Sequence, residues 1–232
     1  MQPLVRYRLE GRVATVTMDD GKLNVLSPTM FDELAAALDR ARDDGAVLLL
    51  GGREGVLSAG FDLKVLRGGG VAAVALVHAG FTLVERLLTF PTPVVIACTG
   101  HAIAMGSFLL LAGDYRVGAH GDYKLTANEV AIGMTLPRAA LEICRQRLAP
   151  AHFTRATLLA EVYDPEQAVA AGFLDRVVPA GELLAVADEL ASTLAKLDMR
   201  AHAASKLRAR EHTLAAMRAA IEADRRELQA RV

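Results

Sequence analysis

The part of this sequence most able to do chemistry joins a turn of small residues to a single acid. Small residues between Gly100 and Gly106 open an apolar helix that we expect to end near Asp114. Backbone N–H groups at a helix start lack helical partners and can hold a developing oxyanion. Glu129 follows in an otherwise uncharged segment, and a lone carboxylate there can move a proton. The pattern indicates chemistry next to an activated carbonyl.

Two interpretations of Glu129 remain open from the pattern alone. Glutamates are usually solvated, so Glu129 could be an ordinary loop carboxylate. Its neighbours, however, include Leu125, Ala127 and Val130. Apolar surroundings raise the pKa of a carboxyl group, which suits a general base near neutral pH.

A serine nucleophile and a metal site are the main competing interpretations. Segment 102–113 looks like the nucleophile turn of the Clp-type serine peptidases, but their nucleophile position falls here on Ala104. Alanine cannot attack a carbonyl, so we expect Ser107 to be structural. The histidines show no HxxxH or HExxH spacing, so no metal site is expected.

Composition narrows the class of protein. The chain has 232 residues, 53% hydrophobic and 23% charged, which is typical of a soluble globular protein with one sizeable core. A formal net charge of −1 argues against a nucleic-acid partner. Cys98 and Cys144 lack CxxC spacing, the N-terminus lacks an apolar signal segment, and we expect no apolar run of membrane-spanning length. A cytoplasmic location without membrane insertion is expected.

The element pattern predicts an α/β core followed by helices. Strands are expected over 13–18, 47–50 and 94–98, separated by helices that start at Ser27-Pro28 and span 71–90. Such alternation implies crossover connections. After about residue 150 the pattern is helical throughout, with helices over the following ranges: 165–171, 182–197 and 201–231. We therefore expect an α/β core over 1–178 and a helical C-terminal region over 179–232.

An ordered set of motifs resembles the crotonase (enoyl-CoA hydratase/isomerase) superfamily. The set comprises Asn24–Pro28, Ser58–Leu63, Gly100–Asp114, Asn128–Gly133 and Ala168–Val178. The resemblance implies a spiral of ββα units with a C-terminal helical region that forms trimers, often paired into hexamers. It also implies acyl-CoA thioester substrates of fatty acid metabolism such as β-oxidation, with coenzyme A arriving on the substrate and no other cofactor.

The same resemblance assigns site residues by position. The thioester oxygen would lie between the backbone N–H groups of Phe61 and Met105, and Glu129 would be the acid–base residue. Further substrate or coenzyme A contacts would fall on Lys22, Leu23, Ala59, Phe61, Phe108, Lys206 and Arg208.

Phe108 differs from the pattern of the two-glutamate hydratases in this superfamily, which carry their first catalytic glutamate at this position. Isomerases of the superfamily have an apolar residue there and Asn-Glu at the second position, as in Asn128-Glu129. The resemblance thus favours 3-enoyl-CoA to 2-enoyl-CoA isomerisation. The alternatives are a hydratase whose second acid comes from elsewhere (Glu142, Glu161 or Asp62) and a non-catalytic acyl-CoA binding protein.

The basic C-terminal stretch is expected to contact both coenzyme A and a partner subunit. Lys206 or Arg208 would help to hold the phosphates of coenzyme A. Apolar positions on the same stretch would face a partner subunit of the homo-oligomer: Leu207, Leu214, Met217 and Ile221.

Overall fold

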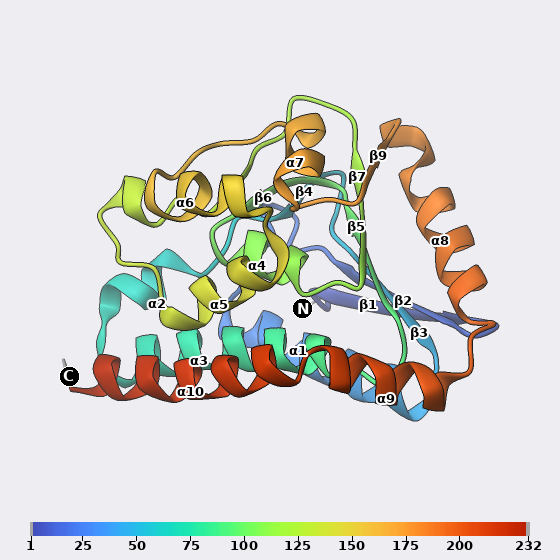
Figure 1. Cartoon of the computed structure of the whole chain (residues 1–232), viewed down its shortest axis with the longest axis horizontal. Coiled ribbons are helices and arrows are strands. Elements are labelled where there is room, and N and C mark those ends of the chain that lie inside the picture. Colours follow the sequence, from blue (N-terminus) through green and yellow to red (C-terminus); the bar gives the residue numbers. More distant parts are fainter. Residues whose placement is uncertain (1, 231–232) are drawn as a thin grey trace.

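The computed structural model describes residues 2–230, in which strands and helices alternate (Figure 1). Its strands are β1 (Val5–Glu10), β2 (Val13–Met18), β3 (Val47–Gly51), β4 (Gly55–Ser58), β5 (Val94–Cys98), β6 (Gly100–Ile103), β7 (Tyr115–Ala119), β8 (Leu125–Thr126) and β9 (Arg176–Val178). Its helices are α1 (Pro28–Asp43), α2 (Leu63–Gly68), α3 (Gly70–Leu88), α4 (Met105–Leu111), α5 (Arg138–Arg147), α6 (Pro150–Leu158), α7 (Pro165–Ala171), α8 (Leu183–Leu194), α9 (Met199–Ala209) and α10 (Glu211–Gln229), with single 3₁₀ turns η1 (Val130–Ile132) and η2 (Ala180–Glu182).

Two sheets organise these elements. The larger has the order β1-β2-β3-β5-β7-β9, in which only the β1–β2 pair is antiparallel. The smaller has the order β4-β6-β8 and is parallel. The expected α/β fold with crossover connections is confirmed.

The two faces of the larger sheet bury different sets of side chains. Leu48 and Leu50 of β3 point to the main core, which α1, α3, α4, α5 and α10 complete. Leu49 points to a second core, which α8 covers. Figure 1 shows α8 on one side of the strands, away from α10, which runs beside α3. Side-chain alternation along each strand therefore gives the sheet two buried faces.

Local capping explains the start of α1. The Ser27 hydroxyl accepts a hydrogen bond from the Met30 N–H at 3.2 Å, and Pro28 occupies the first helical turn. This arrangement satisfies a backbone donor that the helix cannot pair itself. The predicted helix start is confirmed.

Three sequence expectations differ from the structure. Gly100–Ile103, expected as a turn, forms β6 between β4 and β8. The helix expected over 201–231 divides at Arg210, whose φ of −107° and ψ of 7° end α9 and precede α10. The part after residue 150, expected to be helical throughout, contributes β9 to the larger sheet. Pairing with distant strands overrides the local pattern in the first and third cases.

Helix α3 corrects the expectation about membrane-spanning length. By length and composition it could cross a membrane. Its buried side chains, among them Phe81, Val84 and Leu88, instead lie in the main core. Packing against the rest of the chain accounts for the apolar composition of α3.

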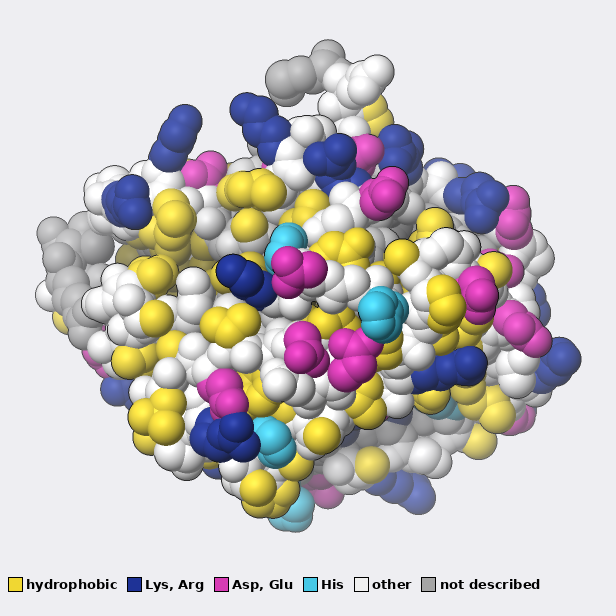
Figure 2. Space-filling view, turned by 90° about the horizontal axis from the view of Figure 1, so that it is seen from above, with side chains coloured by type: hydrophobic (Ala, Val, Ile, Leu, Met, Phe, Trp, Pro, Cys, Tyr) yellow, Lys and Arg dark blue, Asp and Glu magenta, His cyan; other side chains and the backbone are white. Residues whose placement is uncertain are grey.

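The surface seen in Figure 2 mixes charges of both signs. Lysine and arginine side chains lie between aspartates and glutamates, with apolar side chains scattered among them. This face presents no field of one sign that would favour a polyanion.

Candidate active site

The backbone around Phe61 leaves one amide free. Leu26 donates from its N–H to the Gly60 carbonyl at 2.8 Å and accepts from the Asp62 N–H at 3.2 Å. Because successive amides of an extended segment point in opposite directions, the Phe61 N–H points away from Leu26. Within residues 2–230 no hydrogen bond from this amide is found.

A second free amide lies at the start of α4. Met105 is the first residue of α4, so its N–H has no helical partner. Ala104 precedes it with a φ of 51° and a ψ of −124°, a conformation that turns the chain sharply from β6 into the helix. This conformation is costly for a residue other than glycine and is typical of functional turns.

Gly60 brings the two amides together. Its φ is +91°, and a Cβ added there would lie 3.0 Å from the Ile103 oxygen and 3.3 Å from the Met105 nitrogen. Only a residue without a side chain permits this approach. The loop that carries Phe61 therefore lies directly against the start of α4, as an oxyanion hole requires.

Buried polar side chains hold the Phe61 loop in place, and sequence analysis missed their role. The Asn24 amide nitrogen donates to the carbonyls of Met18 and Leu57 at 3.0 and 3.2 Å. The Ser58 hydroxyl donates to the Asn24 carbonyl at 2.7 Å and accepts from the Gly60 N–H at 3.1 Å. Both residues lie in motifs that the sequence had singled out, but spacing gives no sign that they contact each other.

Ser107 is engaged within its own helix. Its hydroxyl is fully buried and donates to the Ala104 carbonyl at 2.7 Å. Among the described residues, no histidine or other base forms a hydrogen bond with the Ser107 hydroxyl. The structural role expected for Ser107 agrees with this geometry.

Glu129 is a buried acid with one unpartnered carboxylate oxygen in the described part of the chain. It is 6% exposed, and no described residue donates a hydrogen bond to its Oε2 atom. Burial raises the pKa of Glu129 to about 7, opposed by a hydrogen bond from its own backbone N–H. The structure favours the base-like interpretation over a solvated loop carboxylate.

Strand pairing brings the Glu129 segment to the free amides. The Thr126 carbonyl of β8 accepts from the Ala104 N–H at 2.9 Å, so the chain that leads to Glu129 starts beside α4. The acid is followed by η1, which ends at Gly133 in the left-handed conformation. Three separate segments thus supply a buried carboxylate and two free amides, and hydrogen bonding between β6 and β8 joins the acid segment to the start of α4.

Phe108 belongs to a chain of aromatic rings that includes Phe61, whose backbone amide is free. The ring centroids of Phe108 and Phe81 are 6.0 Å apart. The Phe61 centroid lies 6.4 Å from that of Phe81 and 6.1 Å from that of Phe31. Phe108 is 1% exposed. An apolar side chain therefore fills the place where a second acid was considered, and direct contact with substrate remains a prediction.

The other acids considered as partners for Glu129 are engaged elsewhere. Asp62 accepts from the Lys64 N–H and so caps α2. Glu142 forms an ion pair with Arg145, and Glu161 pairs with Arg155 and accepts from Tyr163. None of the contacts made by these three acids points to a shared role with Glu129.

The expected coenzyme A contacts near the Phe61 loop do lie together. The Ala59 N–H donates to the Leu23 carbonyl at 3.0 Å, and Leu23 is 56% exposed. The Arg53 guanidinium donates to the Lys22 carbonyl at 2.8 Å. These residues form an exposed edge beside the oxyanion loop.

Lys206 is not free to bind phosphate, which corrects the expectation for this residue. It is 6% exposed, and its ammonium lies 2.7 Å from Asp114 Oδ2. Burial lowers its pKa to about 8, partly offset by Asp114. Arg210, one turn later, binds the other Asp114 oxygen at 2.7 Å. Arg208 is exposed and remains a candidate.

The apolar residues expected to face a partner subunit are mostly internal. Leu214, Met217 and Ile221 are 4%, 0% and 6% exposed and lie in the main core of their own chain. Helix α10 uses them to pack against α3 and α5. Leu207, at 45% exposed, is the member of the expected set that stays on the surface.

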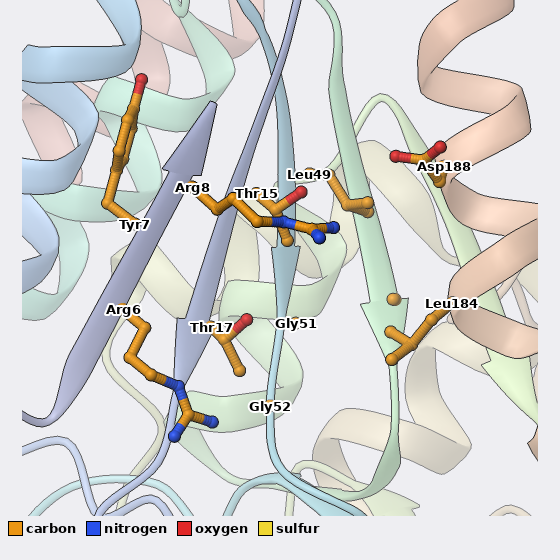
Figure 3. Close-up of a pocket in the computed structure, with 11 residues that line it drawn as sticks. Arg6, Tyr7, Arg8, Thr15, Thr17, Leu49, Gly51, Gly52, Leu184 and Asp188 are labelled. Atoms are coloured by element: carbon orange, nitrogen blue, oxygen red, sulfur yellow. The ribbon is translucent and has the colours of Figure 1, made fainter. Parts of the chain in front are cut away.

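A separate cavity of about 480 Å³ lies on the outer face of the larger sheet (Figure 3). Arg6 and Arg8 of β1 form one wall, and Leu184 and Asp188 of α8 form the other. None of the residues expected at the site lines it. The chemistry inferred for Glu129 is therefore not located in this cavity.

Comparisons with known proteins agree with the geometry. A family model described as enoyl-CoA hydratase/isomerase matches residues 8–231. The probable enoyl-CoA hydratase echA17 of Mycobacterium avium is 32% identical over 161 residues, which are 67% of this chain and 61% of that protein. The aligned chain thus spans about three-fifths of the length of that curated relative.

Solved structures match over nearly the whole chain. An enoyl-CoA hydratase/isomerase family protein from Pseudomonas syringae has a TM-score of 0.95 and 46% identity, covering 97% of this chain and 98% of that one. A structure described as an enoyl-CoA isomerase of Mycobacterium tuberculosis has a TM-score of 0.93 and 47% identity, with the same two coverages.

Proposed function

Because the chain belongs to the enoyl-CoA hydratase/isomerase family, we propose that it converts 3-enoyl-CoA thioesters to 2-enoyl-CoA thioesters. The observation that carries the proposal is a buried acid, Glu129, whose Oε2 has no hydrogen-bond partner among the described residues and which follows Thr126, the residue hydrogen-bonded to Ala104 beside the free Met105 amide. Such a set can abstract a proton next to a thioester and stabilise the resulting charge.

The reaction needs two proton transfers and one oxyanion. Glu129 removes a proton from C2, and the C–H electron pair becomes part of a dienolate whose charge rests on the thioester oxygen. The N–H groups of Phe61 and Met105 donate to this oxygen. Glu129 then returns the proton to C4, which leaves the double bond between C2 and C3. Loss of one such donor typically raises the barrier by roughly 3 kcal/mol.

The environment of Glu129 suits a base that works alone. A pKa of about 7 leaves a substantial fraction ionised near neutral pH while keeping the carboxylate basic enough to take a carbon-bound proton. Hydration would need a second group to orient and activate water. Phe108 can do neither, and Asp62, Glu142 and Glu161 are held in other contacts.

The relatives support the family chemistry and carry both activity names. One solved relative is described as an enoyl-CoA isomerase, and the curated relative is named a probable hydratase. The choice of isomerase for this chain therefore rests on Phe108 and on the isolation of Glu129.

The decisive experiment compares 3-enoyl-CoA and 2-enoyl-CoA as substrates for wild type, Glu129→Gln and Glu142→Gln. Isomerisation by wild type and Glu142→Gln, with loss in Glu129→Gln, is the expected result. Hydration of 2-enoyl-CoA that depends on both glutamates would favour a hydratase with a non-standard second acid. Tight thioester binding without turnover in wild type would favour a binding protein.

We also propose a homo-oligomer, most simply a trimer, that acts in the cytoplasm on fatty acyl-CoA substrates. Exposed Leu197 and Leu207, at 47% and 45%, supply apolar surface at the two ends of the α9 region for a partner. Sedimentation of the full chain as a monomer would contradict the oligomer.

Arg208 is the proposed cation for the phosphates of coenzyme A.

A further inference from the structure

Asp224 makes an unusual contact between two helices. It lies on α10, is 7% exposed, and accepts from the N–H groups of Arg138 and Ala139, both at 3.0 Å. Its Oδ1 also accepts from the Arg138 guanidinium at 3.1 Å. One buried carboxylate thus binds the first two backbone amides of α5.

Helix α5 has no cap of its own. Pro137 precedes it and provides no side-chain acceptor for the orphan N–H groups. An acceptor at a helix start satisfies these donors, and a negative charge there also interacts favourably with the helix dipole. Asp224 provides both the acceptor and the negative charge, although it lies 86 positions from Arg138 along the chain.

A short segment joins Glu129 to the capped end of α5. Only residues 130–137 separate Glu129 from α5, and within them Val130, Ile132 and Met134 are 44%, 51% and 40% exposed. The Glu129 carbonyl accepts from the Met134 N–H at 2.9 Å, so the segment folds back on the acid.

The hydrogen bonds of Asp224 lie beside a cavity between residues 130–137 and α10. A cavity of about 270 Å³ is lined by Thr135, Leu136 and Pro137 on one side and by Asp224 and Leu228 on the other. A groove thus separates part of the segment from α10, and the hydrogen bonds of Asp224 join α10 to the first residues of α5 beside it. On its other side α10 packs against α3, whose Phe81 contacts the ring of Phe61.

We propose that Asp224 is a positioning residue for Glu129: by capping α5 from α10, its carboxylate holds the acid in its dry position relative to the Phe61 loop. The role in turnover rests on the proposed function, but the role in placing Glu129 does not.

Three variants separate capping from other effects. Asp224→Ala removes the acceptor of both amides. Arg138→Ala is the matched control, because it deletes the ion pair but keeps the two backbone donors and the carboxylate. Asp224→Asn keeps one oxygen acceptor without the charge, and it provides a second test should the alanine variant not fold.

The primary measurement is the titration of Glu129 followed by ¹³C NMR in protein labelled at glutamate carboxyl carbons, with Glu129→Gln identifying the signal. In Asp224→Ala we expect the pKa of Glu129 to fall from about 7 toward 4.5, because the released segment admits water. Arg138→Ala should keep the wild-type value, and Asp224→Asn should lie between. An unchanged value in Asp224→Ala or Asp224→Asn, or an equal fall in Arg138→Ala, overturns the proposal.

Kinetics with 3-enoyl-CoA provide the second measurement. Asp224→Ala should lower kcat by about 10- to 100-fold, with KM within about threefold, because a small displacement of the base weakens proton transfer more than binding. A kcat within about twofold of wild type would contradict a positioning role in turnover. If wild type does not isomerise 3-enoyl-CoA, the proposed function fails, whereas the titration still decides the placement of Glu129.

Discussion

Replacing Glu129 by glutamine should make the protein more stable at alkaline pH while it removes activity. The pKa of Glu129 is about 7 in the folded protein, against an ordinary value of 4.5. The folded state therefore holds this proton more tightly than the unfolded chain does. Its stabilising contribution is complete below pH 4.5 and is lost as the pH rises through 7.

The size of the effect follows from the two pKa values. Their difference corresponds to about 3 kcal/mol, which wild type loses between acidic and alkaline pH because a carboxylate must then ionise in a dry site. Glutamine has nearly the same shape and never ionises. Any constant cost of its amide is the same at every pH, so it cancels when the two proteins are compared across the pH range.

Urea unfolding followed by circular dichroism at pH 4.5, 7 and 9 tests this reasoning, at one fixed protein concentration. The stability of Glu129→Gln relative to wild type should rise by up to about 3 kcal/mol between the extremes. Glu142→Gln, which removes a surface carboxylate paired with Arg145, is the matched control and should show no comparable rise. A difference between Glu129→Gln and wild type that stays constant with pH would refute the assigned environment of Glu129.

Four further predictions follow from the same contacts. The kcat/KM for 3-enoyl-CoA should increase with pH and level off above about 7, because the ionised form of Glu129 is the base; a profile flat from pH 5 upward would contradict this. Gly60→Ala should lower kcat by at least about 100-fold, since its Cβ would meet the Ile103 oxygen at 3.0 Å and displace an oxyanion donor; near wild-type turnover in a folded variant counts against the hole. Phe108→Ala should lower the free energy of unfolding by about 3–5 kcal/mol, measured with urea, because a fully buried ring is lost; a change under about 1 kcal/mol would show that the ring is not packed as described. Lys206→Ala should cost about 1.5–3 kcal/mol of stability, because Asp114 loses one charged hydrogen-bond donor but keeps Arg210, whereas Arg208→Ala should spare stability and raise KM; the reverse pattern would restore Lys206 as the phosphate ligand.

Local sequence signals predicted the elements that depend on near neighbours. Ser27-Pro28 identified the start of α1 because a capping hydroxyl and a proline act within one turn. Residues 94–98 were predicted as a strand and form β5, and 165–171 were predicted as a helix and form α7. The apolar flanks of Glu129 left burial and a solvated loop carboxylate both open, and the structure buries the side chain although Val130 and Ile132 are exposed.

Short strands were harder to recognise, because pairing rather than composition creates them. β6 has four residues, two of which are His101 and Gly100, and its strand character comes from β4 and β8 on either side. The same pairing brings Ala104 to Thr126, and with it the acid segment to α4. The candidate residues could therefore be proposed from the sequence, but the pairing that connects their segments could not.

The sequence by itself determined which residues could do the chemistry: one acid in apolar surroundings, a small-residue turn before a helix, and Phe108 where a second acid could have stood. Only the tertiary structure decided the fate of the charged residues in the C-terminal helices. Lys206 lies 92 positions from Asp114, and Asp224 lies 86 positions from the amide that it caps. Whether a charged side chain is buried and paired depends on partners that the fold brings together from distant parts of the chain. Spacing along the sequence does not show which of these distant residues come into contact.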